Sequence, residues 1–171
     1  MIGYDPLLVF ILASLVLAIT PGPDNLYVMM QSAVYGYKTG VLITLGLCTG
    51  LLMHTAAVAL GLTLLLLSLP YILPLLKLFG ASYLVYLSWQ SYRAADIDIS
   101  LQNHEALTTF QSYKRGIILN VSNPKVGLFF LAFLPQFTNI TQGGLLEQTL
   151  LLGGMFIAIT VIVFTGIAII S

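Results

Sequence analysis

The first residues with an evident chemical capacity interrupt an apolar stretch near the N-terminus. The segment LAITPGPDNLYVMM (residues 17–30) passes from apolar residues into the Pro21–Pro23 break, continues with Asp24 and Asn25, and then becomes apolar again. An amide and a carboxylate at such a place can bind polar or charged groups, and the carboxylate can exchange a proton. Within a bilayer an ionised aspartate costs about 2.5–3.5 kcal/mol at the helix centre, so a functional role is the default interpretation there.

The two prolines predict a break between two helices. Pro21 and Pro23 cannot donate backbone hydrogen bonds, and a proline inside a helix costs about 3 kcal/mol. A new helix can begin at once with Thr20 or Gly22 as its N-cap, because proline is tolerated at the first helical position. Asp24 then lies in the first turn, where free N–H groups and the positive end of the helix dipole attract anions. The alternative is a proline kink that Asp24 merely caps.

A second segment, GIILNVSNPKVGLFFLAFLPQF (residues 116–137), repeats this pattern. Asn123 can cap a helix, Pro124 fits the first helical position, and Lys125 falls in the first turn, where its charge opposes the helix dipole. A negative partner is expected, either Asp24 or a substrate carboxylate. We therefore expect the two breaks to face each other and to form or gate one polar site. The alternative is that Lys125 reaches the cytoplasmic interface along its aliphatic stem.

Other polar residues give weaker signals. His54 lies deep in an apolar segment, where it could relay protons together with Asp24 or simply pack with a hydrogen bond. Asn120 and Gln136 bracket the second motif and could line a polar path. Gly46 and Gly50, in the small-xxx-small pattern GLCTG, predict a close helix contact, either within the chain or in a homodimer.

The composition places these motifs in a membrane protein. Of 171 residues, 58% are hydrophobic and 7% are charged, whereas soluble domains carry about 25% charged residues. Long apolar runs without alternation favour helices over strands, so we expect a single all-α transmembrane domain over residues 1–171. The net charge of zero gives no basic footprint for nucleic acid. Neither a metal-ligand cluster nor a nucleotide loop or nucleophile motif is present, so we expect no metal, no cofactor and no enzymatic activity.

Five hydrophobic segments are long enough to cross a bilayer. They run approximately over Leu7–Val34, Val41–Leu69, Tyr71–Tyr92, Gly116–Phe137 and Leu145–Ile170. The apolar part of the first segment before its break spans only about 21 Å at the helical rise, so the break is expected inside the membrane.

The basic residues suggest an orientation. With the N-terminus outside, four of them fall on the cytoplasmic side and one outside, which agrees with the positive-inside rule. The four are Lys38, Arg93, Lys114 and Arg115, and the exception is Lys77. The polar stretch 93–115 is then a cytoplasmic loop between a three-helix half (1–92) and a shorter second half (116–171). Three segments before such a loop predict inverted-repeat-like halves, of which the second is one helix short.

The two motifs resemble those of the LysE/RhtB family of bacterial amino-acid exporters, and the resemblance covers essentially the whole chain. The first motif carries Thr20, Pro21, Gly22, Pro23, Asp24, Gly36, Gly40, Gly46 and Gly50. The second carries Asn120, Asn123, Pro124, Lys125, Phe129, Phe130, Pro135 and Gln136.

The resemblance implies a small inner-membrane protein that exports amino acids or related zwitterionic metabolites, driven by the proton gradient. It also implies six hydrophobic segments, one more than the five found here. A truncated, non-transporting or structural membrane fragment is therefore an alternative. An intramembrane enzyme using Asp24 and His54 is a further one, with no paired acid or metal set to support it. The expected partners are an amino acid, protons, lipid and a second copy of the chain.

Overall fold

The structure, a computed structural model, describes residues 3–68, several residues between 74 and 89, and residues 107–139 and 143–171. All regular elements in these parts of the chain are helical, which confirms the expected all-α fold. The elements are α1 (Tyr4–Ile19), α2 (Pro23–Tyr35), α3 (Tyr37–Ser68), α5 (Thr109–Ser122), α6 (Pro124–Leu128), the π-helical η1 (Phe129–Phe133), the 3₁₀-helical η2 (Leu134–Phe137) and α7 (Leu145–Ile170).

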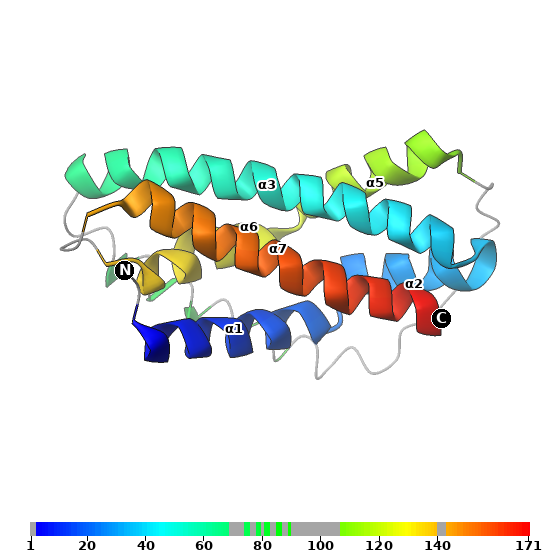
Figure 1. The fold of residues 1–171 in the computed structure, drawn as a ribbon, viewed down its shortest axis with the longest axis horizontal. Helices are drawn as coiled ribbons and strands as arrows, with labels where there is room; N and C mark the ends of the chain where they lie inside the picture. The colour runs from blue at the N-terminus through cyan, green and yellow to red at the C-terminus, as the bar shows by residue number, and fades with distance from the viewer. Residues whose placement is uncertain are drawn as a thin grey trace.

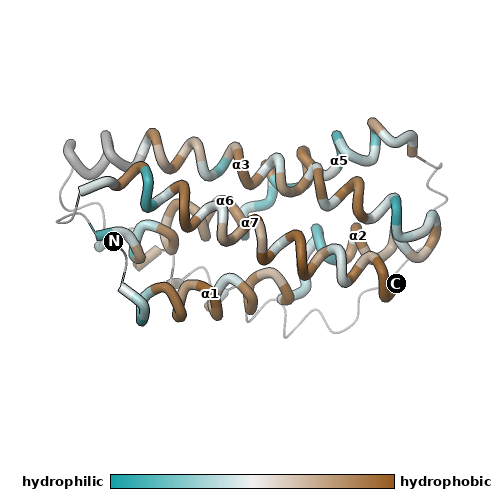
Figure 2. The backbone as a smooth tube through the Cα atoms, viewed as in Figure 1, coloured by the Kyte–Doolittle hydropathy of each residue, from teal (hydrophilic) through white to brown (hydrophobic). Residues whose placement is uncertain are grey.

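The helices run up and down along one long axis (Figure 1). α1 and α2 together run in one direction, and α7 runs in the same direction. α3 and the α5–α6 pair run in the opposite direction (Figure 1). α3 packs along both α5 and α7, and the α1–α2 pair closes the bundle against α7. Figure 2 shows apolar residues along most of α1 and α7, as expected for surfaces that face lipid.

The described helices provide two to four membrane spans. Two helical stretches, Tyr37–Gly61 and Leu145–Ile170, are long and apolar enough to cross a membrane alone. The pair α1–α2, bent by 55°, qualifies as one span, and so does α5 together with the helical run Pro124–Phe137 (α6, η1 and η2), bent by 52°. The predicted third segment, Tyr71–Tyr92, lies mostly outside the described residues. The expected five hydrophobic helices are therefore not confirmed, nor is the inverted-repeat arrangement of the halves.

Both breaks follow from local sequence. Gly22 has extended backbone angles (φ −157°, ψ 175°) and is the N-cap of α2, with Pro23 at its first position. The other break is at Asn123, whose side-chain Oδ1 accepts a hydrogen bond of 3.0 Å from the Lys125 backbone N–H. Pro124 takes the first position of α6, where a missing N–H has no cost. The sequence offered Thr20 or Gly22 as the first cap, and the structure selects Gly22.

α5 begins earlier than the sequence pattern suggested. Thr108 and Gln111 form a capping box, in which each side chain bonds the backbone N–H of the other residue, and this box starts the helix at Thr109. The last part of the predicted loop 93–115 is thus helical. Residues 93–106 lie outside the described part of the chain.

The small residues of α3 serve contacts within the chain. A Cβ on Gly46 would overlap the Tyr113 carbonyl oxygen and lie 3.0 Å from Gly116 Cα, and one on Gly50 would lie 2.7 Å from Asn120 Cβ. α3 and α5 can approach this closely only because both contribute glycines. The contact between α3 and α5 explains why glycine stands at positions 46 and 50, so a homodimer is not needed to explain Gly46 and Gly50.

Two adjacent glycines in α7 offer a test of this packing. A Cβ on Gly153 would lie 2.5 Å from Thr55 Oγ1, whereas one on Gly154 would meet nothing within 4 Å. Thr55 cannot easily turn away, because its hydroxyl donates to the Leu51 carbonyl at 2.8 Å. We expect Gly153→Ala to lower the free energy of unfolding by about 1–3 kcal/mol. Gly154→Ala should leave it unchanged or raise it by up to about 1 kcal/mol.

Thermal unfolding of the two purified variants in detergent measures this difference. Equal melting temperatures for the two would contradict the α3–α7 packing described above.

Candidate functional site

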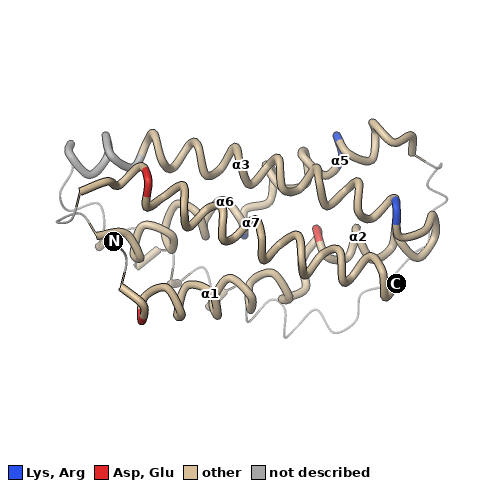
Figure 3. The backbone as a smooth tube through the Cα atoms, viewed as in Figure 1, with Lys and Arg blue, Asp and Glu red and all other residues tan. Residues whose placement is uncertain are grey.

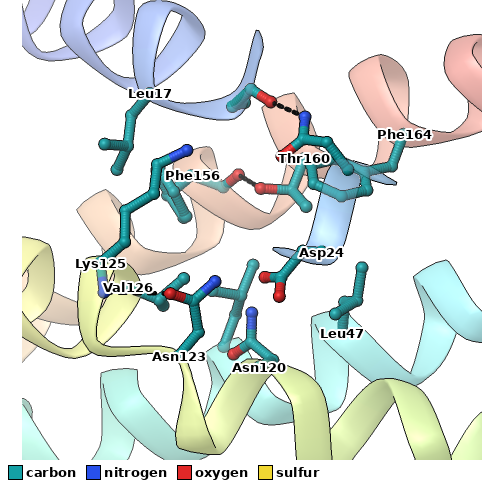
Figure 4. A pocket seen from close by; sticks show the side chains of 13 residues that line it. Leu17, Asp24, Leu47, Asn120, Asn123, Lys125, Val126, Phe156, Thr160 and Phe164 are labelled. Carbon is teal, nitrogen blue, oxygen red and sulfur yellow. Dashed lines mark hydrogen bonds between the residues drawn. The ribbon is translucent and has the colours of Figure 1, made fainter. Parts of the chain in front are cut away.

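The two breaks meet at a buried cavity in the middle of the bundle (Figure 4). Helices α1, α2, α3, α5, α6 and α7 all contribute to its wall. The polar lining residues are Asp24, Asn25, Asn120, Asn123, Lys125 and Thr160. The apolar ones are Leu17, Ala18, Leu47, Leu51, Val126, Phe156 and Phe164. The structure thus brings together the charged residues of both motifs, as the sequence led us to expect.

Asp24 is the anionic group of the cavity. It lies in the first turn of α2 and is only 4% exposed. The side-chain amides of Asn120 and Asn123, from α5 and its C-terminal break, point toward its carboxylate (Figure 4). One carboxylate oxygen, Oδ1, is buried without a hydrogen-bond partner, and so is Asn120 Oδ1. Buried acceptors of this kind are rare, and each needs a reason.

Lys125 is the cationic group, and it joins the two halves of the chain. Its side chain is 9% exposed, so it does not reach the interface as the alternative interpretation required. Its Nζ donates a hydrogen bond of 2.8 Å to the Thr20 carbonyl, at the end of α1. The positive charge of Lys125 also interacts electrostatically with Asp24. Because a buried charge is costly without compensation, each of these two groups helps to stabilise the other.

The broken end of α1 explains why these partners are needed. The last carbonyls of a helix have no donor in the helix itself, and the prolines of the break supply none. Asn25 Nδ2 donates to the Ala18 carbonyl at 2.7 Å, and Lys125 takes the Thr20 carbonyl. Asn25 and Lys125, two residues of the predicted site, therefore stabilise the break as an ordered junction between α1, α2 and α6.

The cavity is too small for an amino acid in this conformation. It offers about 20 Å³ of room for the centre of a water molecule, and about 10–15 Å³ is enough for one water. One side of it belongs to an apolar cluster containing Leu51, Val126 and Phe156, and the other to a cluster containing Leu47 and Phe164. The polar site thus lies between two apolar clusters.

His54 lies beside the site and not in it. Its Nε2 is 3.4 Å from the Asn120 carbonyl oxygen, and its ring stacks on Phe130 with 5.7 Å between the ring centroids. That carbonyl accepts a hydrogen bond of 3.1 Å from the Asn123 backbone N–H, whereas Pro124, four residues after Asn120, has no N–H to offer it. His54 therefore contacts the backbone of a site residue, and its ring is not part of the cavity wall.

Some predicted site residues lie elsewhere. Gln136, in η2, is exposed and donates to the Ala132 carbonyl at 2.8 Å, so it does not join the cavity. Pro21 and Pro124 are exposed as well, and they shape the breaks without lining the cavity.

The contribution of α7 to the site was not predicted from the sequence. Thr160 lines the cavity, and its hydroxyl donates to the Phe156 carbonyl at 2.9 Å. The available signal was one of three threonines in this segment, with nothing to distinguish it from Thr149 and Thr165. Two further buried polar atoms were also missed, Ser14 Oγ in α1 and Gln31 Oε1 in α2, and neither has a hydrogen-bond partner.

Comparison with known proteins supports a transport role for this arrangement. Residues 15–171 match the family described as LysE type translocator. The homoserine/homoserine lactone efflux protein of Salmonella typhimurium is 36% identical over 164 residues, which cover 93% of this chain and 77% of that protein. The uncharacterized membrane protein YrhP of Bacillus subtilis is 30% identical over 167 residues, with 92% and 79% covered.

The leucine efflux protein of Salmonella choleraesuis is 30% identical over 135 residues, covering 77% of this chain and 63% of that protein. No solved structure matches the chain.

Proposed function

Because the chain belongs to the LysE type translocator family, we propose that it exports amino acids or related amino compounds across the bacterial inner membrane in exchange for protons. The observation that carries this proposal is the cavity at the two helix breaks, with Asp24 and Lys125 both in its wall. A zwitterionic substrate offers one group to each of these charges. The non-transporting alternative is not favoured, since the family match extends over residues 15–171.

The named substrates of the Salmonella relatives suggest candidates for this chain. Those names are homoserine, homoserine lactone and leucine. All three compounds carry a primary amino group, whereas the lactone is a cyclic ester without a free carboxylate. We adopt homoserine, its lactone and leucine as the first compounds to test.

Proton exchange would follow from the single carboxylate in the cavity. The Asp24 carboxylate can accept a proton or a substrate ammonium group, and occupation by one disfavours the other. A transporter whose binding site takes either ligand alternately exchanges them across the membrane. His54, beside Asn120, is a secondary candidate for proton movement.

The charge distribution supports the proposed orientation. Figure 3 shows basic residues at one end of the bundle, where α3 and α5 begin, and acidic residues at the opposite end, where α1 and α7 begin. The described basic residues at the first end are Lys38, Lys114 and Arg115. By the positive-inside rule this end faces the cytoplasm, and the N-terminus lies outside.

Export requires the cavity to open alternately to the two sides. The α1–α2 and α5–α6 pairs run in opposite directions and bend by similar angles, which supports the proposed inverted-repeat relation of the halves. The hydrogen bond from Lys125 to the Thr20 carbonyl links the two pairs at their breaks. We propose that this link opens and re-forms during each transport cycle.

The test is efflux from cells that express this chain. Cells are loaded with amino acids by feeding dipeptides, and release is followed with and without a protonophore. We expect release of at least one of the candidate classes above the empty-vector level, and loss of that release with the protonophore. Efflux at the empty-vector level for the whole panel would contradict the proposed function. Efflux that is insensitive to the protonophore would contradict proton exchange alone.

A further inference from the structure

We infer that the buried face of the α1–α2 pair is the translocation path, with Gln31 as a polar subsite on the cytoplasmic side of Asp24 and Ser14 as one on the outer side. Each subsite receives the ammonium group of the substrate on its way to or from Asp24. The inference rests on the proposed export function and orientation. It goes beyond them by assigning two residues outside the cavity to the route through the membrane.

The first argument is where the unpartnered polar atoms lie. Among the described residues, four have a buried side-chain oxygen without a hydrogen-bond partner: Ser14, Asp24, Gln31 and Asn120. Three of the four belong to the α1–α2 pair, whereas Asn120 packs against Gly50 of α3. Ser14 is 0% exposed and Gln31 is 3% exposed. Buried polar atoms without partners are rare, so three of them on one helix pair need a common explanation.

The second argument is that these three residues share one face of the pair. The buried residues of α1 are Phe10, Ser14 and Ala18, and a spacing of four residues places them on one stripe. Ser14 thus lies one turn, about 6 Å, from Ala18 of the cavity wall. Gln31 lies two turns, about 10 Å, from Asp24 on the buried side of α2. Since α1 and α2 run in one direction along the bundle (Figure 1), the stripe extends to both sides of the cavity.

The third argument is that Ser14 differs from other buried hydroxyl residues of the bundle. A serine or threonine in a helix commonly donates to the carbonyl four residues earlier. Five buried hydroxyls do so at 2.7–2.9 Å, those of Ser32, Thr44, Thr55, Thr149 and Thr160. The Phe10 carbonyl offers the same bond to Ser14, but Ser14 Oγ does not make it. The hydroxyl of Ser14 is therefore available to a ligand.

The three oxygens suit the passage of an ammonium group. Such a group loses its hydration in an apolar layer, which is costly unless acceptors replace the water. Gln31 Oε1, Asp24 Oδ1 and Ser14 Oγ can each accept an N–H. Of the three, only Asp24 carries a charge, so it is the strongest binding point and the two neutral residues bind more weakly. Weak flanking subsites let the substrate enter and leave, as conduction past a binding site requires.

The variants Ser14→Ala and Gln31→Met test this inference in the full chain. Both remove the unpartnered oxygen, and methionine retains the unbranched shape of glutamine. A polar group without a partner contributes nothing to folding, so both variants should melt in detergent at or above the temperature of the original chain. Counterflow of radiolabelled homoserine or leucine in proteoliposomes and protonophore-sensitive efflux from cells should both fall at least about fivefold.

Ser32→Ala is the matched control, because it makes the same change at a buried serine of α2 whose hydroxyl already donates to the Val28 carbonyl at 2.7 Å. It should leave both transport activities within about twofold of the original rates. If Ser14→Ala and Gln31→Met transport as well as this control, the inference is overturned and the export proposal stands.

Two further results would also overturn the inference alone. A loss of proton-driven efflux with full counterflow would mean that the two residues serve the proton and not the substrate. A loss of transport that is accompanied by a lower melting temperature would mean that Ser14 and Gln31 support the fold and not the path. Absence of counterflow and of efflux in the original chain would instead overturn the proposed function, and this inference with it.

Discussion

The Asp24→Asn variant is expected to lose export almost completely. Asparagine keeps the size and shape of the side chain, but it carries no charge, cannot bind a proton in exchange, and presents an amide to the amides of Asn120 and Asn123. Removing one partner of a buried, hydrogen-bonded charge pair between a protein and its ligand costs about 2–5 kcal/mol of binding free energy, and each 1.4 kcal/mol is a factor of ten. Proton-driven efflux and homoserine counterflow should therefore both fall by about 100-fold or more.

The matched control is Asp5→Asn, an identical change at an exposed carboxylate in the first turn of α1. It should leave efflux within about twofold of the original rate. Equal detergent-solubilised yields of both variants establish that the protein still folds. If Asp24→Asn keeps counterflow and loses only the proton-driven component, Asp24 carries the proton without binding the substrate. Full retention of both activities would remove Asp24 from the mechanism altogether.

Much of the fold was predictable because membrane helices leave strong signals. The last segment, Leu145–Ile170, was predicted with the same bounds as α7, since an uninterrupted apolar run has only one way to cross a membrane. The Pro21–Pro23 and Asn123–Pro124 breaks were predictable because proline removes a backbone donor wherever it stands. The start of α5 was not predicted, because the capping box at Thr108 lies in a polar stretch that hydropathy alone assigns to a loop.

The charged residues of the site could be predicted from the sequence, but the contacts that they make could not. Asp24 and Lys125 were singled out because unpaired charges in apolar segments need partners. That Lys125 donates to the Thr20 carbonyl was not predicted, since this contact joins residues 105 positions apart. Thr160 was missed for the opposite reason, because a threonine in an apolar helix commonly bonds its own backbone and gives no sign of lining a cavity. Gln136 was included on its proximity to the motif, and the structure places it at the exposed end of η2.

The second large effect is expected at the contact between α3 and α5, because this contact positions Asn120 of α5 beside Asp24. A Cβ on Gly46 would overlap the Tyr113 carbonyl oxygen, and one on Gly116 would overlap the Ile43 carbonyl oxygen. Both obstacles are backbone atoms, so no side-chain rotation can relieve the overlap. Gly46→Ala must push α5 away from α3, and α5 carries Asn120 toward the Asp24 carboxylate. We expect a loss of about 2–3 kcal/mol or more in the free energy of unfolding, and a fall in efflux.

Gly61→Ala is the control for this change because it adds the same methyl group to the same helix. A Cβ on Gly61 meets nothing within 4 Å, and alanine is the better helix former by about 1 kcal/mol. Its melting temperature in detergent should equal or exceed that of the original chain, with efflux unchanged, whereas Gly46→Ala should melt well below it. If Gly46→Ala has the same melting temperature as Gly61→Ala but loses efflux, the contact between α3 and α5 positions the site without contributing to stability. If both variants melt and transport alike, the close approach of α3 and α5 is not how Asn120 is held against Asp24.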